Sequence, residues 1–230
     1  MLTPDPADRA HWSVVIPTLE EAQQLPLLLA QLQGPEEVWV VDGGSCDGTQ
    51  QLALAMGARL LRCSQPSRGA QLAAGAAQAS RPWLLFLHAD ARLPQHWAPA
   101  LARALAAPSV VAAAFRLRVR GTDWKLRLLE RLVGWRSRWR GLPYGDQGLA
   151  LAATTYRSCG GFRPLPLMED LELVQRLGQR GRVALAQASL KVSGRRWRRL
   201  GVWRSSWRNA CLRAAWRRGV PADQLARLYR

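Results

Sequence analysis

Acidic side chains stand where predicted strands end or predicted helices begin. Asp42 opens the segment Asp-Gly-Gly-Ser-Cys-Asp-Gly-Thr, Asp90 closes Leu-His-Ala-Asp, and Asp146 lies in Tyr-Gly-Asp-Gln-Gly. Glu169 and Asp170 begin a helical segment. Each position also fits an ordinary role, because Asp-Gly marks turns and an acidic residue caps helix starts. Their joint order favours chemistry, since carboxylates bind divalent cations and accept protons from hydroxyl groups.

Alternating strands and helices are predicted to position these side chains. The expected strands are 12–17, 37–42, 59–63, 83–88, 110–117, 149–156 and 183–192. The expected helices are 20–33, 49–56, 69–79, 95–107, 123–140 and 169–179. This alternation predicts an α/β fold with a mostly parallel central sheet and helices on both faces. Ligands of such sheets bind beyond the carboxyl ends of the strands, where these acidic positions fall.

The chain is strongly basic, with a formal net charge of +17 over 230 residues. Arginine supplies nearly all of the excess, because Lys125 and Lys191 are the two lysines. Arginine binds phosphate bidentately, so nucleic acid, anionic lipid and phosphorylated substrates are candidate partners. A solvated basic surface would also account for the charge. The hydrophobic content of 48% is enough to bury one core, which predicts a single domain over 1–230.

The cysteines and the N-terminus indicate a compartment. Cys46, Cys63, Cys159 and Cys211 form no Cys-x-x-Cys pair, which argues against a zinc ribbon or a thioredoxin-like site and favours a reducing compartment. The N-terminus has no apolar signal region, and no run approaches 18 apolar residues. We therefore expect a cytoplasmic protein, peripheral on the inner face of the cell membrane.

Five segments in one order resemble glycosyltransferase family 2. They are Val-Val-Ile-Pro-Thr-Leu-Glu-Glu, Val-Val-Asp-Gly-Gly-Ser-Cys-Asp-Gly-Thr, Ser-Arg-Gly-Ala-Gln-Leu, Leu-Phe-Leu-His-Ala-Asp and Met-Glu-Asp-Leu-Glu-Leu. The resemblance covers roughly 12–195, leaving a basic helical tail over 196–230, and it implies the nucleotide-binding fold called GT-A. A small single-domain subgroup with His-Ala-Asp, Gly-Asp-Gln-Gly and Ser-Gly-Arg-Arg-Trp, here Ser193 to Trp197, is most similar.

The resemblance implies an inverting transfer of a sugar from a nucleotide-sugar donor, with UDP-sugars favoured. The acceptor would be a hydroxyl or a carboxylate. A membrane lipid or a carotenoid acid is the acceptor to try first, because some proteins of this type are similar to carotenoid-acid glucosyltransferases.

The same resemblance assigns donor-binding residues. Pro17, Thr18 and Glu20 would line the base pocket, and Asp42 would accept hydrogen bonds from the base or the ribose. The nucleotide would also contact two residues at a helix start, Arg68 and Gly69. The departing diphosphate would be held by Arg195 and Arg196, although a solvated basic turn is an equally good interpretation of that pair.

The divalent metal, Mn²⁺ or Mg²⁺, would be bound by Asp90. The family often has Asp-x-Asp where this chain has His88-Ala89-Asp90. Histidine can ligate Mn²⁺ but suits Mg²⁺ poorly, so the choice of metal stays open. The alternative for His88 is an ordinary hydrogen bond to a neighbour at the strand end.

Asp170 is the candidate general base, with Glu169 as the alternative. Two adjacent carboxylates repel each other, which raises the pKa of one of them. Asp146 and Gln147 would shape the pocket for the acceptor or the sugar.

Tryptophan and arginine are interleaved in two segments. Nine arginines lie between Arg195 and Arg218, among Trp197, Trp203, Trp207 and Trp216, and 123–140 repeats the pattern. Trp suits a water–hydrocarbon boundary and Arg suits anionic headgroups, so we expect peripheral contact with an anionic membrane. The alternative is that the tryptophans pack on the domain.

Two other classes of protein are open. A nucleic-acid-binding protein would explain the charge, but aspartates beside a groove would repel phosphate, so no nucleic acid is expected. A catalytically inactive relative would bind the nucleotide without turnover.

Overall fold

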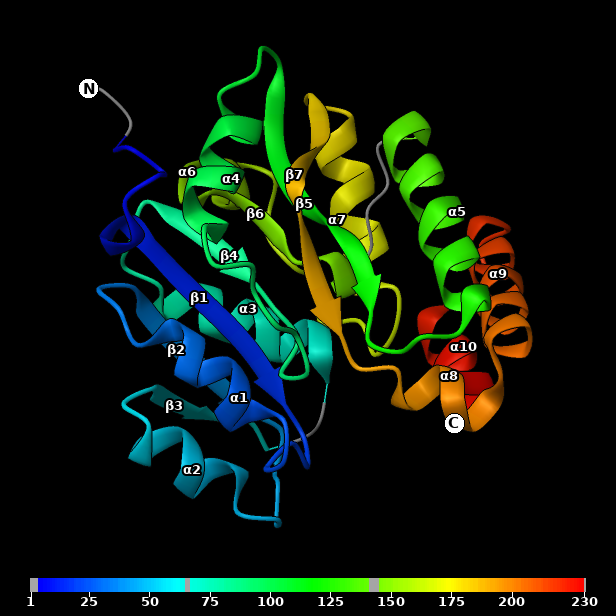
Figure 1. The fold of residues 1–230 in the computed structure, drawn as a ribbon, viewed down its shortest axis with the longest axis horizontal. Helices are drawn as coiled ribbons and strands as arrows, with labels where there is room; N and C mark the ends of the chain where they lie inside the picture. Colours follow the sequence, from blue (N-terminus) through cyan, green and yellow to red (C-terminus); the bar gives the residue numbers. More distant parts are fainter. Residues whose placement is uncertain (1–3, 65–66, 141–144, 230) are drawn as a thin grey trace.

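A computed structural model describes residues 4–64, 67–140 and 145–229. The sheet has the strand order β3-β2-β1-β4-β6-β5-β7 (Figure 1). The strands are β1 (Trp12–Thr18), β2 (Glu37–Asp42), β3 (Arg59–Arg62), β4 (Trp83–Phe86), β5 (Val110–Val119), β6 (Leu149–Ala152) and β7 (Arg182–Val192). Strand β6 pairs antiparallel with β4 and β5, and the other described pairings are parallel. The mostly parallel α/β sheet expected from the sequence is confirmed.

Helices cover both faces of this sheet. They are α1 (Leu25–Leu29), α2 (Thr49–Ala55), α3 (Arg68–Gln78), α4 (Trp97–Leu105), α5 (Trp124–Arg140), α6 (Ala153–Ser158), α7 (Glu169–Gly178), α8 (Arg195–Leu200), α9 (Val202–Arg217) and α10 (Ala222–Tyr229). Short 3-10 helices span Arg9–His11, Ala30–Leu32 and Gly145–Gln147. The last three α-helices confirm the helical tail. None of the helices in the described ranges is both long and apolar enough to cross a bilayer.

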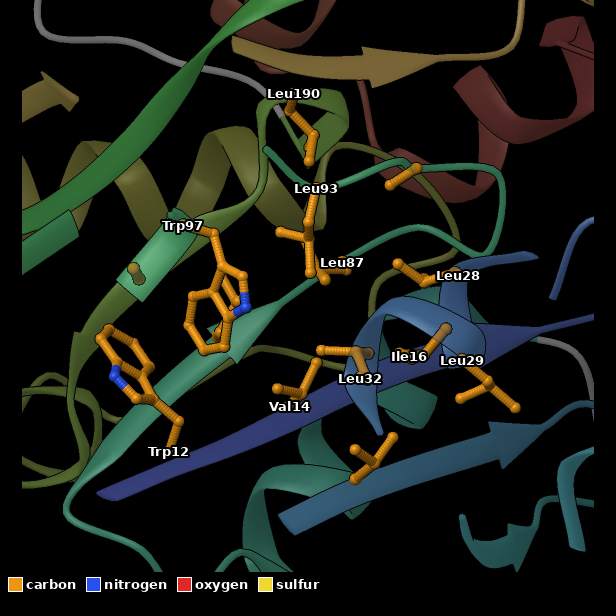
Figure 2. Close-up of a cluster of buried hydrophobic side chains, with 14 of the residues drawn as sticks. Trp12, Val14, Ile16, Leu28, Leu29, Leu32, Leu87, Leu93, Trp97 and Leu190 are labelled. Carbon is orange, nitrogen blue, oxygen red and sulfur yellow. The ribbon is translucent and has the colours of Figure 1, made fainter. Parts of the chain in front are cut away.

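Alternate residues of β1 point into two separate cores. Val14 and Ile16 pack with α1, α2 and α4, whereas Val15 packs with α3 and α7 on the other face. In the first core the rings of Trp12 and Trp97 meet edge to face, with centroids 5.5 Å apart (Figure 2). This period of two identifies a strand that is buried on both faces, as the sequence predicted. The two cores fix the strand ends at which the acidic residues lie.

The helix predicted over 20–33 is wrong in its first part. Residues 20–24 form a bend and a turn, because the amides of Glu20, Glu21 and Ala22 are bonded by side chains of the loop after β2 and of the start of α2. The amides of Glu20 and Glu21 are bonded by Ser45 Oγ and Thr49 Oγ1, at 2.9 and 3.0 Å. Glu20 also has a positive φ of 54°. A tertiary contact therefore outweighs the helical periodicity.

The strand predicted over 149–156 is wrong in its second half. Strand β6 ends at Ala152 and α6 begins at once. The change of direction places the Tyr156 ring against Phe86 and Phe162, with centroids 5.4 and 6.0 Å away. Packing in the second core thus decides the local structure.

Candidate active site

The loop after β2 is organised around the carboxylate of Asp42. This side chain is fully buried and accepts five hydrogen bonds, whose donors are Thr18 Oγ1, Ser45 Oγ, Gln50 Nε2 and the amides of Gly44 and Ser45. Burial alone would raise the pKa of Asp42, but these donors outweigh it and lower the pKa. Gly44 has a φ of 99°, which glycine adopts without strain. Asp42 therefore fixes the shape of the loop, and its contact with a nucleoside stays a prediction.

The ends of β1 and β2 are held together by a residue that the sequence analysis missed. Buried Gln71 on α3 donates to the carbonyls of Thr18 and Val41, at 2.9 and 2.7 Å. Beside it, Pro17 lines an apolar hollow with Leu72. The exposed Glu20 carboxylate accepts from the amide of Cys46 at 2.7 Å. The base-pocket candidates Pro17, Thr18 and Glu20 thus surround one strand end.

Glu169 and Asp170 have different surroundings. Glu169 is buried in an ion pair with Arg68, from the start of α3. Burial raises the pKa of Glu169, the negative charge of Asp170 raises it further, and Arg68 opposes both effects. Asp170 is half-buried and faces the cavity, where its Oδ2 accepts from the amide of Gly145 at 2.6 Å. The structure therefore places the carboxylate of Asp170, rather than that of Glu169, where a substrate can reach it.

Gly145 shows how closely the site residues approach one another. A Cβ atom there would lie 2.9 Å from Asp170 Oδ2, 3.2 Å from His88 Nε2 and 3.3 Å from Arg68 Nη2. Three elements distant in the sequence thus bring an acid, an imidazole and a guanidinium around one backbone position. Gly69 has a related packing role, because a Cβ there would lie 2.3 Å from the carbonyl oxygen of Arg163.

A cavity of about 150 Å³ opens beside these groups. Its walls include the site residues Arg68, His88, Asp146, Glu169 and Asp170. Helix α9 supplies the remaining polar wall with Asn209 and Arg213, next to Leu212. This helix was expected only as part of the basic tail, and Asn209 and Arg213 were not predicted to be site residues. Their spacing marks one helical face, but no motif in the sequence connects that face with the acidic residues.

Gln147 lies beneath the cavity rather than in its wall. Its side chain is fully buried, donates to the carbonyl of Phe115 at 3.0 Å, and accepts from Ser137 Oγ at 3.1 Å. These bonds attach the 3-10 helix Gly145–Gln147 to β5 and α5. Gln147 can therefore affect the pocket only by positioning its neighbour Asp146, which lines the cavity.

A second group of charges surrounds Asp90 after β4. Glu21 accepts from Arg195 Nη2 at 3.1 Å, which brings the start of α8 to the end of β1. Burial raises the pKa of Glu21, Arg195 lowers it, and the nearby charge of Asp90 raises it again. Asp90, Glu21 and Arg195 are therefore neighbours. The side chain of Arg196, the other residue expected at the diphosphate, lies outside the described residues.

The donor set at Asp90 suits a cation that is shared with a substrate. In the part of the chain that the structure describes, no group of three or more His, Cys, Asp or Glu side chains could hold a metal. A divalent ion bound by one or two protein groups and by substrate phosphates needs no such cage. Asp90 could offer such an ion a carboxylate oxygen, which suits Mn²⁺ or Mg²⁺. The His88 imidazole, which lies near Gly145, would suit Mn²⁺ better than Mg²⁺.

Comparison with known proteins identifies the family. Residues 13–166 match the sequence profile described as Glycosyl transferase family 2. The chain belongs to this family. Uncharacterized glycosyltransferases of Mycobacterium bovis and Mycobacterium tuberculosis are 30% identical to it over 137 residues, which is 58% of this chain. The match spans 63% of the length of these relatives.

Solved structures share the fold at low sequence identity. TarS of S. aureus has a TM-score of 0.62 at 16% identity, covering 80% of this chain and 60% of its own. A mannosyltransferase from Pyrobaculum calidifontis, in complex with GDP-Man and Mn²⁺, has a TM-score of 0.61 at 20% identity, covering 82% and 58%. Glucosyl-3-phosphoglycerate synthase from Mycobacterium tuberculosis, in complex with Mn²⁺ and UDP, has a TM-score of 0.57 at 22% identity, covering 79% and 70%. The GT-A fold expected from the sequence is confirmed.

Proposed function

We propose that this chain is an inverting, metal-dependent glycosyltransferase that uses a UDP-sugar. The observation that carries the proposal is the convergence of Asp170, His88 and Arg68 around Gly145, at the carboxyl ends of the strands in a family 2 fold. The bound molecules of the structural neighbours, UDP with Mn²⁺ and GDP-Man with Mn²⁺, support a nucleotide-sugar donor.

Asp170 acts as the general base when the acceptor is a hydroxyl. Its carboxylate takes the hydroxyl proton while the acceptor oxygen forms a bond to the anomeric carbon of the sugar. The bond from that carbon to the diphosphate breaks in the same step, and the diphosphate leaves with the electron pair. Attack opposite the leaving group inverts the anomeric configuration. A carboxylate acceptor is already deprotonated, so its transfer would not need the base.

Positive groups stabilise the departing diphosphate. Asp90, with His88 as a second candidate ligand, would hold the divalent ion, and the ion would neutralise the charge that develops on the diphosphate. Arg195 bonds Glu21, whose pKa is raised by the nearby charge of Asp90, and an arginine can hold the same oxygens bidentately. Glu169 is buried in its ion pair with Arg68, which keeps the acceptor hydroxyl away from it and leaves Asp170 as the proton acceptor.

Hydrolysis of a panel of UDP-sugars and GDP-mannose by the purified protein tests this proposal. We expect nucleotide release that requires Mn²⁺ or Mg²⁺ and is lost in Asp90→Ala. Calorimetric binding of a donor without turnover would instead indicate an inactive relative. No nucleotide release from any donor, together with salt-dependent retention of the protein on DNA, would favour a nucleic-acid-binding protein.

We also propose that the outer faces of α5 and α9 contact an anionic bilayer that holds the acceptor. The two helices pack side by side beyond β5 and β7 (Figure 1). On α5, Leu126 and Val133 face a small core, whereas Trp124, Leu132 and Trp135 point outward and are 64%, 51% and 62% exposed. A helix that exposes apolar residues opposite its buried stripe has a second partner surface.

Helix α9 repeats the arrangement. Val202 and Leu212 are buried, whereas Trp203 and Trp207 are 46% and 74% exposed. Residues 195–218 contain nine arginines and no acidic residue, so their charge complements anionic headgroups. The opposite face of α9 lines the cavity beside Asp170, so one helix would connect the membrane with the site.

Flotation with vesicles tests the membrane contact without requiring turnover. We expect the protein to float with phosphatidylglycerol-containing vesicles and to stay behind with neutral phosphatidylcholine. The double variant Trp203→Ser with Trp207→Ser should bind the vesicles at least about tenfold more weakly than the wild type. Leu27→Ser with Leu54→Ser is the matched control, because these leucines are 52% and 54% exposed on α1 and α2. Failure of the wild type to float, or equal loss in both variants, would contradict the proposal.

A further inference from the structure

Arginine side chains gather at one edge of the sheet, next to Asp90. Arg92 follows β4, Arg120 follows β5, and Arg195 and Arg198 lie on α8 after β7. The ends of β5 and β7 point the same way, and the chain leads from β7 directly into α8 (Figure 1). We use the name arginine cradle for these four arginines together with Gln24.

Two guanidinium groups of the cradle share one neutral acceptor. Arg92 Nη2 and Arg120 Nη2 each donate to Gln24 Oε1 at 3.0 Å, so the two nitrogens lie within about twice that distance. Among the described residues, neither arginine forms an ion pair with a carboxylate. An amide oxygen has no formal charge and does not offset two cations. The pair therefore carries excess positive charge at close range.

Arg92 is half-buried, and its guanidinium lies close to that of Arg120 through the shared Gln24 oxygen. The carboxylate of Glu21 pairs with Arg195 rather than with Arg92 or Arg120. Like charges that are partly removed from water are stabilised when an anion joins them.

A hollow of about 370 Å³ adjoins three of the four arginines, Arg120, Arg195 and Arg198. Its other walls are Gln24, Gly121, Ser193 and Gly194, and Arg92 is linked to this hollow through its bond to Gln24. The Ser-Gly-Arg-Arg turn approaches β5 closely there, because a Cβ at Gly194 would lie 2.4 Å from the carbonyl oxygen of Arg120. The hollow thus has room for a ligand, and three of its lining residues are arginines.

We propose that the arginine cradle binds an oxyanion of the phosphate class. Guanidinium groups bind such oxyanions through paired N–H donors, and several converging forks add specificity. Resting on the proposed function, this site would receive either the diphosphate of the donor or a phosphate group carried by the acceptor. Both sources offer the same chemistry, and competition between ligands distinguishes them.

Thermal unfolding of the full chain in inorganic phosphate tests the cradle. At equal ionic strength, phosphate should raise the unfolding temperature above that in chloride, because a ligand that binds the folded state stabilises it. Arg120→Gln should weaken phosphate binding by about tenfold or more. Arg198→Gln should weaken phosphate binding as well. Because Arg198 is exposed, this substitution should leave the stability of the fold unchanged. Arg103→Gln, an exposed arginine on α4, is the control.

The outcomes separate the alternatives. No phosphate-specific rise in the wild type would overturn the proposal, and so would an equal rise in the cradle variants and in Arg103→Gln. Phosphate binding that persists in saturating UDP with Mn²⁺ supports the cradle and assigns it to the acceptor. Competition between UDP and phosphate supports it and assigns the donor. Phosphate binding needs no turnover, so the cradle can be upheld even if sugar transfer is never observed.

Discussion

Replacing Asp170 by Asn tests the assignment of the general base. The carboxylate accepts from the Gly145 amide at Oδ2 and from the Leu171 amide at Oδ1, at 2.6 and 2.7 Å. The single oxygen of Asn can keep one of these two bonds, and its NH2 group cannot accept the other. The capacity to accept a proton should disappear, and the Kd for the donor reports whether the site keeps its shape. A positioned base contributes about 10²- to 10⁴-fold in rate, which is about 3 to 5 kcal/mol at about 1.4 kcal/mol per tenfold change.

The assay is nucleotide release coupled to a hydroxyl acceptor, beside calorimetric titration of the donor. We expect kcat to fall by about 10²-fold or more while the Kd for the donor stays within about threefold. The control is Glu172→Gln on the same helix, because Glu172 pairs with Arg163 and Arg176 outside the cavity. An Asp170→Asn enzyme that keeps a third of the wild-type kcat with a hydroxyl acceptor would refute this assignment.

Three further predictions address the site and the scaffold. Gly145→Ala should lower kcat by about tenfold or more with an unchanged unfolding temperature, because the new methyl would lie 2.9 Å from Asp170 Oδ2. Full activity of Gly145→Ala would show that the new methyl group does not displace the Asp170 carboxylate, contrary to this prediction. Arg213→Ala should lower kcat/KM by about tenfold, since Arg213 lines the cavity. An unchanged kcat/KM would remove α9 from the site. Glu37→Gln should cost about 1 to 3 kcal/mol of unfolding free energy in urea at neutral pH. Burial would raise the pKa of Glu37, but bonds from Ser13 and Ser80 and the charge of Arg59 lower it below the ordinary 4.5. This stability is therefore present above pH 4.5 and is lost as the pH falls through the lower folded pKa, so wild type and variant should converge in acid. A difference in unfolding free energy between wild type and variant that stays constant down to pH 2 would contradict a lowered pKa of Glu37.

The strand ends could be predicted because they depend on short-range patterns. Val14, Val15 and Ile16 form a continuous apolar run of β-branched residues, which favours a strand buried on both faces, and Asp42 follows a run of the same kind. The parallel order of such strands brings their ends to one edge, which is where Asp90 was expected and lies. Local pattern and topology were sufficient there.

Contacts between distant segments could not be predicted in this way. Thr49 and Ser45 turn residues 20–24 away from a helix, and the packing of Tyr156 ends β6 early. Arg213 reaches the cavity only because α9 folds back against Asp170. The sequence shows Trp and Arg alternating on that helix but does not show which side faces the cavity.

The properties of the adjacent acids at the start of α7, Glu169 and Asp170, could be predicted only in part. Adjacent carboxylates predicted one raised pKa, and the pKa of Glu169 is raised. The adjacent charge is a lesser cause than burial, which depends on the contact with Arg68 from a remote helix. The tertiary ion pair is what separates the surroundings of Glu169 from those of Asp170.

The most direct test of inverting sugar transfer is the anomer that the enzyme releases first. With water as the acceptor, ¹H NMR during the first turnovers on UDP-α-glucose and Mn²⁺ detects the free sugar before it mutarotates. In-line displacement predicts β-glucose, and the signal should vanish in Asp90→Ala. Release of α-glucose would contradict the single displacement.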